Sequence, residues 1–156
     1  MSPTLSLDHF LPYRCNNLAQ KISLSLSRIY VDRFGITIPE WRVLVTLAKY
    51  GERQAKQVGE LTSMDKVRVS RAVAGLQQRG LLLRRPCSRD SRAAWLCLSD
   101  AGEALYRRIE PQALAWEAEL LEPLSGEERE ALFGLIDKLE LRLETLGRPG
   151  SGHKEG

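Results

Sequence analysis

Apolar residues recur at steps of three and four along most of the chain, and this spacing constrains the fold more than any other feature. Such spacing places the apolar side chains on one face of an α-helix. The first stripe runs from residue 11 to about residue 33 and consists of Leu11, Cys15, Leu18, Ile22, Leu26 and Ile29. The pattern favours a mainly α fold, with a small β component that makes the class α+β.

Capping signals mark where the first two helices begin and end. Asp8 is expected to cap the first helix, because a carboxylate can accept hydrogen bonds from the free N–H groups of a first turn. Gly35 is expected to end it. The segment Thr37-Ile38-Pro39-Glu40 has the form of a capping box with proline in the first turn, so it predicts a second helix that stops at Gly51.

Two further helices are predicted close together in the middle of the chain. A short one covers about residues 54–61, and a tight connection at residues 62–64 follows it. Asp65 or Ser63 can cap the next helix, which runs to Arg79 and ends at Gly80. Its inner face is expected to consist of Val69, Val73 and Leu76.

A hairpin is predicted after this helix pair. Residues 81–85 and 94–98 are strand candidates, and Leu96 and Leu98 alternate on one face of the second strand. The polar segment 86–92 lies between the candidates and carries two arginines. We therefore expect a β-hairpin whose tip is basic.

Two long helices are predicted in the C-terminal third. Ser99 is expected to cap one of them, and Ser125-Gly126-Glu127-Glu128 is a capping box that opens the other. The last helix carries an apolar stripe of Leu132, Leu135, Ile136, Leu139, Leu143 and Leu146. The stripes of the first and last two helices need a covering surface, which either a second copy or the rest of the same chain can supply.

Charge divides the chain into a basic middle and an acidic end. Residues 53–92 contain ten Lys and Arg and three acidic residues, which give a local charge of +7. Residues 99–146 contain five basic and twelve acidic residues, which give a local charge of −7. A basic block of this kind is typical of a nucleic-acid-binding module, although a solvated charged face has the same composition.

The sequence also sets expectations about compartment and chemistry. It has no apolar run of about 18 residues and no signal peptide, and its three cysteines do not form a secreted disulfide framework, so a cytoplasmic protein is expected. No catalytic motif and no metal-ligand spacing is present. We expect no enzyme activity, no cofactor, no metal site and no membrane partner.

Residues 54–79 have the pattern of a helix-turn-helix, in which the second helix enters the major groove while its back packs on the first. Arginine and lysine can bind phosphates or guanine, serine can bind either, and valine can contact a thymine methyl group. The candidates for these contacts, pointing away from the predicted inner face, are Lys66, Val67, Arg68, Ser70 and Arg71.

The hairpin and the residues after it resemble the MarR family of winged helix-turn-helix regulators. The pattern Asp-x-Arg-x-x-x-Leu-x-Leu-Thr-x-x-Gly is met by Asp90, Arg92, Leu96, Leu98, Ser99 and Gly102, with serine in place of threonine. The segment 64–71 is also similar to the start of that family's recognition helix. The resemblance covers about residues 11–146, including the order of the helices.

This resemblance implies a winged helix-turn-helix with flanking N- and C-terminal dimerisation helices. It implies one domain over residues 1–146, with the winged core at about 37–99 and dimerisation helices at about 8–34 and 99–146. Residues 147–156 are expected to be a disordered tail. The wing would place Arg89 or Arg92 in the minor groove, with Asp90 paired to an arginine.

The resemblance further implies function. The chain would be a homodimeric, sequence-specific regulator of transcription that binds a pseudo-palindromic operator in double-stranded DNA, as a repressor released by a small, aromatic effector. Candidates to line an effector cleft are Tyr13, Arg14, Asn17, Trp41, Arg42 and Trp116. The two tryptophans are alternatively core or interface residues.

Two alternative functions stay open. One is a redox-sensing regulator that acts through Cys15 in the first helix, although a cysteine on an apolar stripe also serves as a small hydrophobic residue. The other is a winged-helix protein-interaction module without DNA binding. The arginines of the predicted recognition helix and wing argue against that module.

Overall fold

The computed structural model describes residues 2–87 and 90–147, with the side chains of residues 86–87 and 90–93 left aside. The chain divides into two compact units, Met1–Ala115 and Trp116–Gly156. Arg89 and the expected tail from residue 148 onwards lie outside the described residues.

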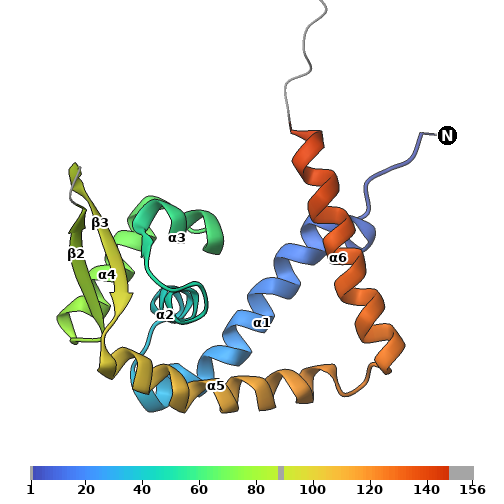
Figure 1. Cartoon of the computed structure of the whole chain (residues 1–156). Helices are drawn as coiled ribbons and strands as arrows, with labels where there is room; N and C mark the ends of the chain where they lie inside the picture. The colour runs from blue at the N-terminus through green and yellow to red at the C-terminus, as the bar shows by residue number, and fades with distance from the viewer. Residues whose placement is uncertain (1, 88–89, 148–156) are drawn as a thin grey trace, which may run out of the picture. The chain divides into compact units, whose positions relative to one another are not determined.

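The first unit is mainly helical and carries one small sheet (Figure 1). Its elements in chain order are η1 (Leu7–His9), α1 (Leu11–Phe34), α2 (Ile38–Tyr50), β1 (Arg53–Gln54), α3 (Ala55–Thr62), α4 (Lys66–Gln78), β2 (Leu82–Cys87), β3 (Asp90–Leu98) and α5 (Asp100–Leu121). Helix α5 continues past the boundary into the second unit. The predicted fold class, α+β with a winged helix-turn-helix, is confirmed.

Most of the predicted helix ends are correct. Thr37 Oγ1 accepts a hydrogen bond from Glu40 N at 3.2 Å, while the Glu40 side chain accepts one from Thr37 N at 3.1 Å, so the capping box forms. Gly35 and Gly80 follow α1 and α4 with positive φ angles of 65° and 72°. Glycine adopts this left-handed backbone without the penalty that a Cβ atom adds.

The predicted cap of the first helix is wrong. Asp8 lies in the short 3-10 helix η1, and α1 begins after Phe10, which makes no side-chain cap hydrogen bond. Pro12 stands in the first turn of α1 and has no N–H group. The first turn therefore has one donor fewer to satisfy, and the helix can begin without a capping side chain.

The sheet is larger than predicted. Its strand order is β1-β3-β2, and β1, which sequence reasoning missed, pairs Arg53 with Leu96 and Gln54 with Trp95. A strand of two residues is too short to show an alternating pattern. Strands β2 and β3 also extend into the segment predicted as a loop, with a register shift between Pro86 and Cys87. Strand β2 lies at the edge, where proline is tolerated in a sheet.

The core of the first unit lies among α2, α3, α4 and the sheet. The predicted inner face of α4 is confirmed, since Val69, Val73 and Leu76 are all buried. They pack in one cluster with buried residues of α2 and the strands, among them Leu44 and Leu96. Burying a side chain of this size contributes about 1.5–3 kcal/mol to the free energy of folding, so this packing holds α4 against α2 and the sheet.

An aromatic stack joins three helices of the same unit. The Trp41 ring of α2 lies 5.1 Å from the Tyr30 ring of α1 and 6.2 Å from the Tyr106 ring of α5, measured between centroids. Close by, Lys49 Nζ lies 2.8 Å from Glu110 Oε1 and joins the end of α2 to α5. Helices α1 and α5 are thus both tied to α2, the helix that precedes the helix-turn-helix.

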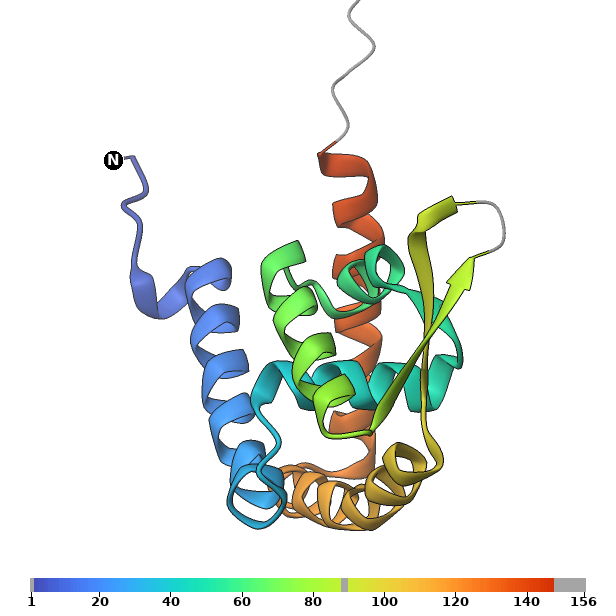
Figure 2. The ribbon, with the colours of Figure 1, turned by 90° about the vertical axis from the view of Figure 1, so that its left-hand side faces the viewer.

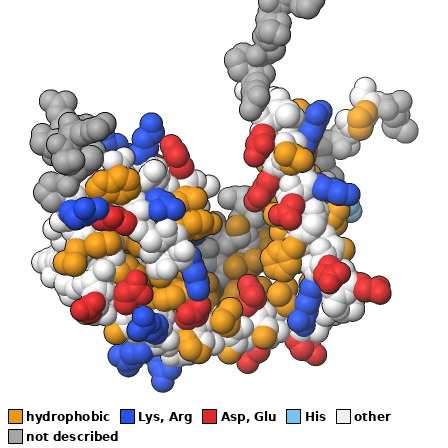
Figure 3. All heavy atoms as spheres, viewed as in Figure 1, with side chains coloured by type: hydrophobic (Ala, Val, Ile, Leu, Met, Phe, Trp, Pro, Cys, Tyr) orange, Lys and Arg blue, Asp and Glu red, His pale blue; other side chains and the backbone are white. Residues whose placement is uncertain are grey.

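The second unit contains the end of α5 and α6 (Gly126–Leu146). Its predicted capping box forms: Ser125 Oγ accepts from Glu128 N at 3.1 Å, and the Glu128 side chain accepts from Ser125 N at 3.0 Å. The apolar stripe of α6 is exposed, and hydrophobic side chains reach the surface along this helix in Figure 3. No described helix is both long enough and apolar enough to cross a membrane.

Candidate nucleic-acid interface

Helix α4 has one face in the core and the rest at the surface. Asp65 caps it, because Arg68 N donates to Asp65 Oδ1 at 2.8 Å. Ser63 instead ends α3 in the left-handed conformation, with φ at 56°. All five predicted DNA contacts on this helix are exposed: Lys66, Val67, Arg68, Ser70 and Arg71. The structure brings these five side chains together on one helix, as the sequence indicated.

Gly75 of α4 lies against the side chain of Glu40 in α2. A Cβ atom added at Gly75 would lie 2.6 Å from Glu40 Oε2, so a larger residue there would displace the Glu40 carboxylate. Glu40 is buried, and its other carboxylate oxygen caps α2.

The last turn of α4 is anchored to two other helices. Arg79 donates to the carbonyl oxygens of Phe34 and Gly35 at 2.9 and 3.2 Å, which satisfies acceptors at the end of α1. Ser99, which precedes α5, donates from Oγ to Gly80 O at 2.6 Å. Helix α4 is therefore held at its end, while its first turns present the basic side chains.

The wing is the hairpin of β2 and β3. Asp90 and Arg92 belong to β3, where only the backbone is described, and Arg89 is outside the described residues. The predicted roles of these three side chains in DNA binding and in shaping the loop stay predictions.

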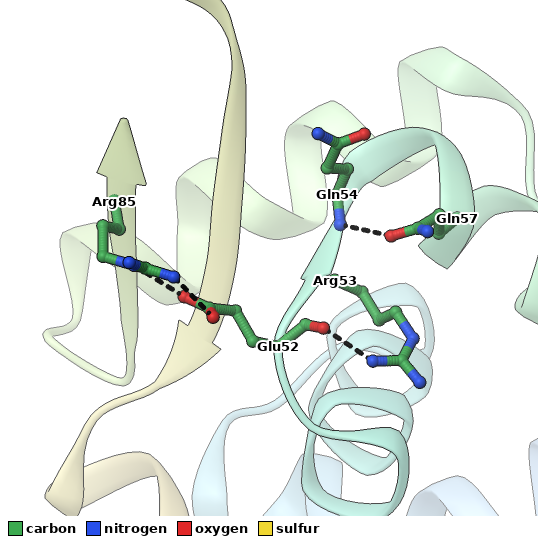
Figure 4. Close-up of polar contacts among 5 residues, drawn as sticks. All are labelled: Glu52, Arg53, Gln54, Gln57 and Arg85. Carbon is green, nitrogen blue, oxygen red and sulfur yellow. Dashed lines mark hydrogen bonds and ion pairs between the residues drawn. The ribbon is translucent and has the colours of Figure 1, made fainter. Parts of the chain in front are cut away.

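An ion pair braces the base of the wing against the turn before β1 (Figure 4). Arg85 of β2 donates from Nε to Glu52 Oε1 at 2.9 Å and from Nη2 to Glu52 Oε2 at 2.8 Å. Two parallel bonds of this kind are the strongest geometry for an arginine and a carboxylate. Sequence reasoning missed the pair, because the two residues lie 33 positions apart and no local pattern links them.

The brace can be measured by a double-mutant cycle. We expect Glu52→Ala and Arg85→Ala to show a coupling of about 0.5–1 kcal/mol in the free energy of unfolding, the range of a well-aligned exposed pair. Urea unfolding of the four variants at one protein concentration gives this value. Purely additive effects would mean that the pair does not hold the wing.

A cleft opens beside α4 within the first unit. It has a volume of about 870 Å³ and is bounded by α1, the start of α2 and one flank of α4, the three helices visible together in Figure 2. The side chains that line it are Asn16, Ala19, Gln20, Ser23, Leu24, Thr37, Ile38, Pro39, Glu40, Arg42, Arg68, Arg71 and Ala72, together with Gly75. Arg42 Nη2 donates to Ser23 Oγ at 3.1 Å, which fixes its guanidinium at the cleft.

Comparison with known proteins agrees with this geometry. Residues 34–93, the helix-turn-helix and most of the wing, match the family model described as MarR family. A crystal structure of a MarR/EmrR family transcriptional regulator from Acinetobacter sp. ADP1 superposes with a TM-score of 0.81 at 28% identity, over 90% of this chain and 99% of that one. The chain is thus similar to MarR-family transcriptional regulators in its winged helix-turn-helix and in its fold.

Two further proteins that this chain resembles are informative. An uncharacterised HTH-type transcriptional regulator from Bacillus cereus is 25% identical over 128 residues, which are 81% of this chain and 85% of the relative. The structure of NadR in complex with 4-hydroxyphenylacetate has the same fold, with a TM-score of 0.74 at 22% identity over 88% of this chain and 97% of that one. The Acinetobacter and Bacillus proteins are described as transcriptional regulators, and the comparisons favour neither the redox-sensing alternative nor the interaction module.

The six predicted effector residues do not all line the cleft. Of them, only Arg42 lines the cleft. Trp41 is 8% exposed and stacks in the core, as its alternative interpretation held, and Trp116 belongs to the second unit. Tyr13 and Arg14 are exposed on α1, where Arg14 donates to Asp8 O, and Asn17 is half-buried on the same helix.

Sequence reasoning missed the α1 side of the cleft. Its polar side chains are Asn16, Gln20 and Ser23, which recur at steps of four and three. That spacing is a polar stripe on one face of α1, the same kind of signal that identified the apolar stripe. Cys15 is exposed on this helix as well, rather than packed as a core residue.

Proposed function

We propose that this chain is a homodimeric repressor of the MarR type that binds a pseudo-palindromic operator and is released from it by a small carboxylate. The observation that carries the proposal is the exposed basic surface on the first turns of α4, on a helix whose opposite face is locked into the core. A helix presented in this way fits the major groove of duplex DNA.

The contacts to DNA follow from the chemistry of the exposed side chains. Arg68 and Arg71 carry forked guanidinium groups that can bind phosphates or the edge of guanine, and Ser70 can donate to either. Val67, which is 57% exposed, is suited to a thymine methyl group. Arg89 or Arg92 of the wing would enter the minor groove, whose negative potential attracts arginine.

The homodimer is supported by apolar surface that has no cover in a single copy. Exposed hydrophobic side chains occur on α1 and along the whole stripe of α6, where they are 38–65% exposed at Leu132, Leu135, Ile136, Leu139, Leu143 and Leu146. A second copy would cover these faces by a twofold interface. Two recognition helices related in this way would read half-sites about one helical turn apart.

The effector proposal rests on the cleft beside α4. Its volume suits a small molecule, and Arg42, held by Ser23, offers a charged group for a carboxylate. A neighbour of the same fold holds 4-hydroxyphenylacetate, a molecule of this class.

A fluorescence-anisotropy titration tests the regulator itself. Duplex from the DNA that flanks the gene is compared with scrambled duplex at two salt concentrations. We expect tighter binding to the flanking duplex and a steep loss of affinity with salt, because arginine and lysine release counterions from the phosphates they contact. Equal affinity for both duplexes would contradict sequence-specific reading of that DNA.

The wing is tested by Arg92→Ala. We expect operator affinity to fall about tenfold, the scale of one specific arginine contact, while the variant stays folded and dimeric. Anisotropy gives the affinity, and light scattering gives the mass. Loss of folding or of the dimer would show that Arg92 supports the structure instead of binding DNA.

A further inference from the structure

We propose that Arg68 and Arg71 bind DNA and the effector in turn, so that the effector releases the operator by direct competition for these two guanidinium groups. The inference rests on the proposed function, and it adds which residues the two ligands share and what kind of inhibition results.

The arrangement of side chains around α4 supports it. Arg68, Arg71, Ala72 and Gly75 follow one another at steps of three, one and three, so they form one flank of the helix, and all four line the cleft. The same two arginines belong to the exposed surface proposed to enter the major groove. The effector cleft and the DNA-reading surface therefore meet along one edge of α4.

The other flank of α4 provides a contrast. Lys66 and Ser70 line a separate hollow of about 610 Å³, formed with residues of α3 and with Arg84 of β2. Lys66 is as much a candidate for a DNA contact as Arg71, but it does not line the cleft. The two flanks thus separate residues shared by both ligands from residues that would serve DNA alone.

Charge makes the cleft a site for an anion. Its ionisable lining consists of three arginines, Arg42, Arg68 and Arg71, against one carboxylate, Glu40. That carboxylate is already engaged as the cap of α2. The Arg68 guanidinium is only loosely paired, with its Nε 3.8 Å from Asp65 Oδ2, at the far end of an exposed side chain. A bound carboxylate can draw Arg68 and Arg71 towards Arg42.

The remaining lining indicates the rest of the ligand. Ala19, Leu24, Ile38 and Pro39 supply apolar surface beside the three arginines. A ring that carries a carboxylate matches this combination, since the ring can pack on apolar side chains while the charge meets the guanidinium groups. A guanidinium held by such a carboxylate is not available to a phosphate or a guanine.

The experiment uses the full chain and 4-hydroxyphenylacetate as the probe. Calorimetry without DNA measures probe binding, and anisotropy measures operator affinity as the probe concentration rises, with sodium chloride keeping ionic strength constant. We expect the apparent Kd for the operator to rise with probe concentration without reaching a plateau. An effector that acts only through a shape change gives a plateau at a fixed coupling factor.

Arg71→Ala and Lys66→Ala are the matched variants. We expect both to weaken operator binding, but only Arg71→Ala to weaken probe binding in the absence of DNA, by about tenfold or more. Arg71→Lys, which keeps the charge and loses the fork, is expected to fall between the wild-type chain and Arg71→Ala. Circular dichroism confirms that each variant is folded.

Three results would overturn the inference: a plateau in operator affinity, probe binding by Arg71→Ala equal to that of the wild-type chain, or no probe binding by the wild-type chain at millimolar concentration. The operator titration described above contains no probe. Its outcome therefore tests the proposed regulator separately from the shared arginines.

Discussion

Gly102→Ala is expected to destabilise the first unit by roughly 3 kcal/mol or more, the scale of a forced backbone movement in a packed region. A Cβ atom at this position would lie 2.1 Å from the carbonyl oxygen of Leu81 and 3.3 Å from the Cβ of Leu98. The nearer of these two atoms, Leu81 O, belongs to the backbone, and it already accepts a hydrogen bond from Ser99 N at 3.0 Å. The added methyl group must therefore push α5 away from the base of the wing.

Gly134→Ala is the matched control, because Gly134 is also helical and a Cβ atom there meets nothing within 4 Å. We expect this variant to be stabilised by up to about 1 kcal/mol, since alanine is the better helix former. Urea unfolding at a single protein concentration compares the two. Equal stability of Gly102→Ala and the wild-type chain would contradict the close packing of α5 on Leu81.

Leu139→Glu is expected to convert the proposed dimer into monomers and to lower operator affinity by about 100-fold or more. Leu139 lies in the middle of the exposed stripe of α6, where a second copy would bury the new carboxylate. A monomer loses the gain from linking two half-site contacts, which commonly amounts to factors of about 10²–10⁴. Light scattering gives the mass, and anisotropy gives the affinity.

Leu141→Glu serves as the control on the same helix. Leu141 is 66% exposed and lies two residues from Leu139, which places it on the opposite side of α6. The same chemical change should therefore leave the mass and the operator affinity unaltered. A dimer that survives Leu139→Glu would show that the stripe does not form the interface.

Short sequence patterns predicted most of the helix ends and the buried face of α4. The capping boxes at Thr37 and Ser125, the glycines that follow α1 and α4, and the buried face of α4 each depend on residues within one or two turns, and each is present in the structure. The exposed row on α4 followed from the same helical period. These interactions leave a pattern in the sequence because their partners are close in it.

Interactions between distant segments left no such pattern. Strand β1 exists because β3 pairs with it, and Arg85 meets Glu52 only after the sheet has formed. The cleft is similar: Arg42 was identified, but the polar face of α1 opposite it became visible only once α1 and α4 were placed. Trp41 was ambiguous for the same reason, since only its neighbours Tyr30 and Tyr106 make it a core residue.

The anchoring of α4 at its last turn separates two tasks along one helix. Residues 79–81 hold the helix to α1 and to the start of α5 through Arg79, Gly80 and Leu81, whereas the candidate DNA contacts on α4 all lie at residues 66–71. The exposed positions of the first turns can thus be exchanged without loosening the attachment. The specificity of α4 can therefore change independently of its attachment to the rest of the unit. Replacing only the exposed residues of its first turns with those of a related regulator should redirect the chain to a different operator.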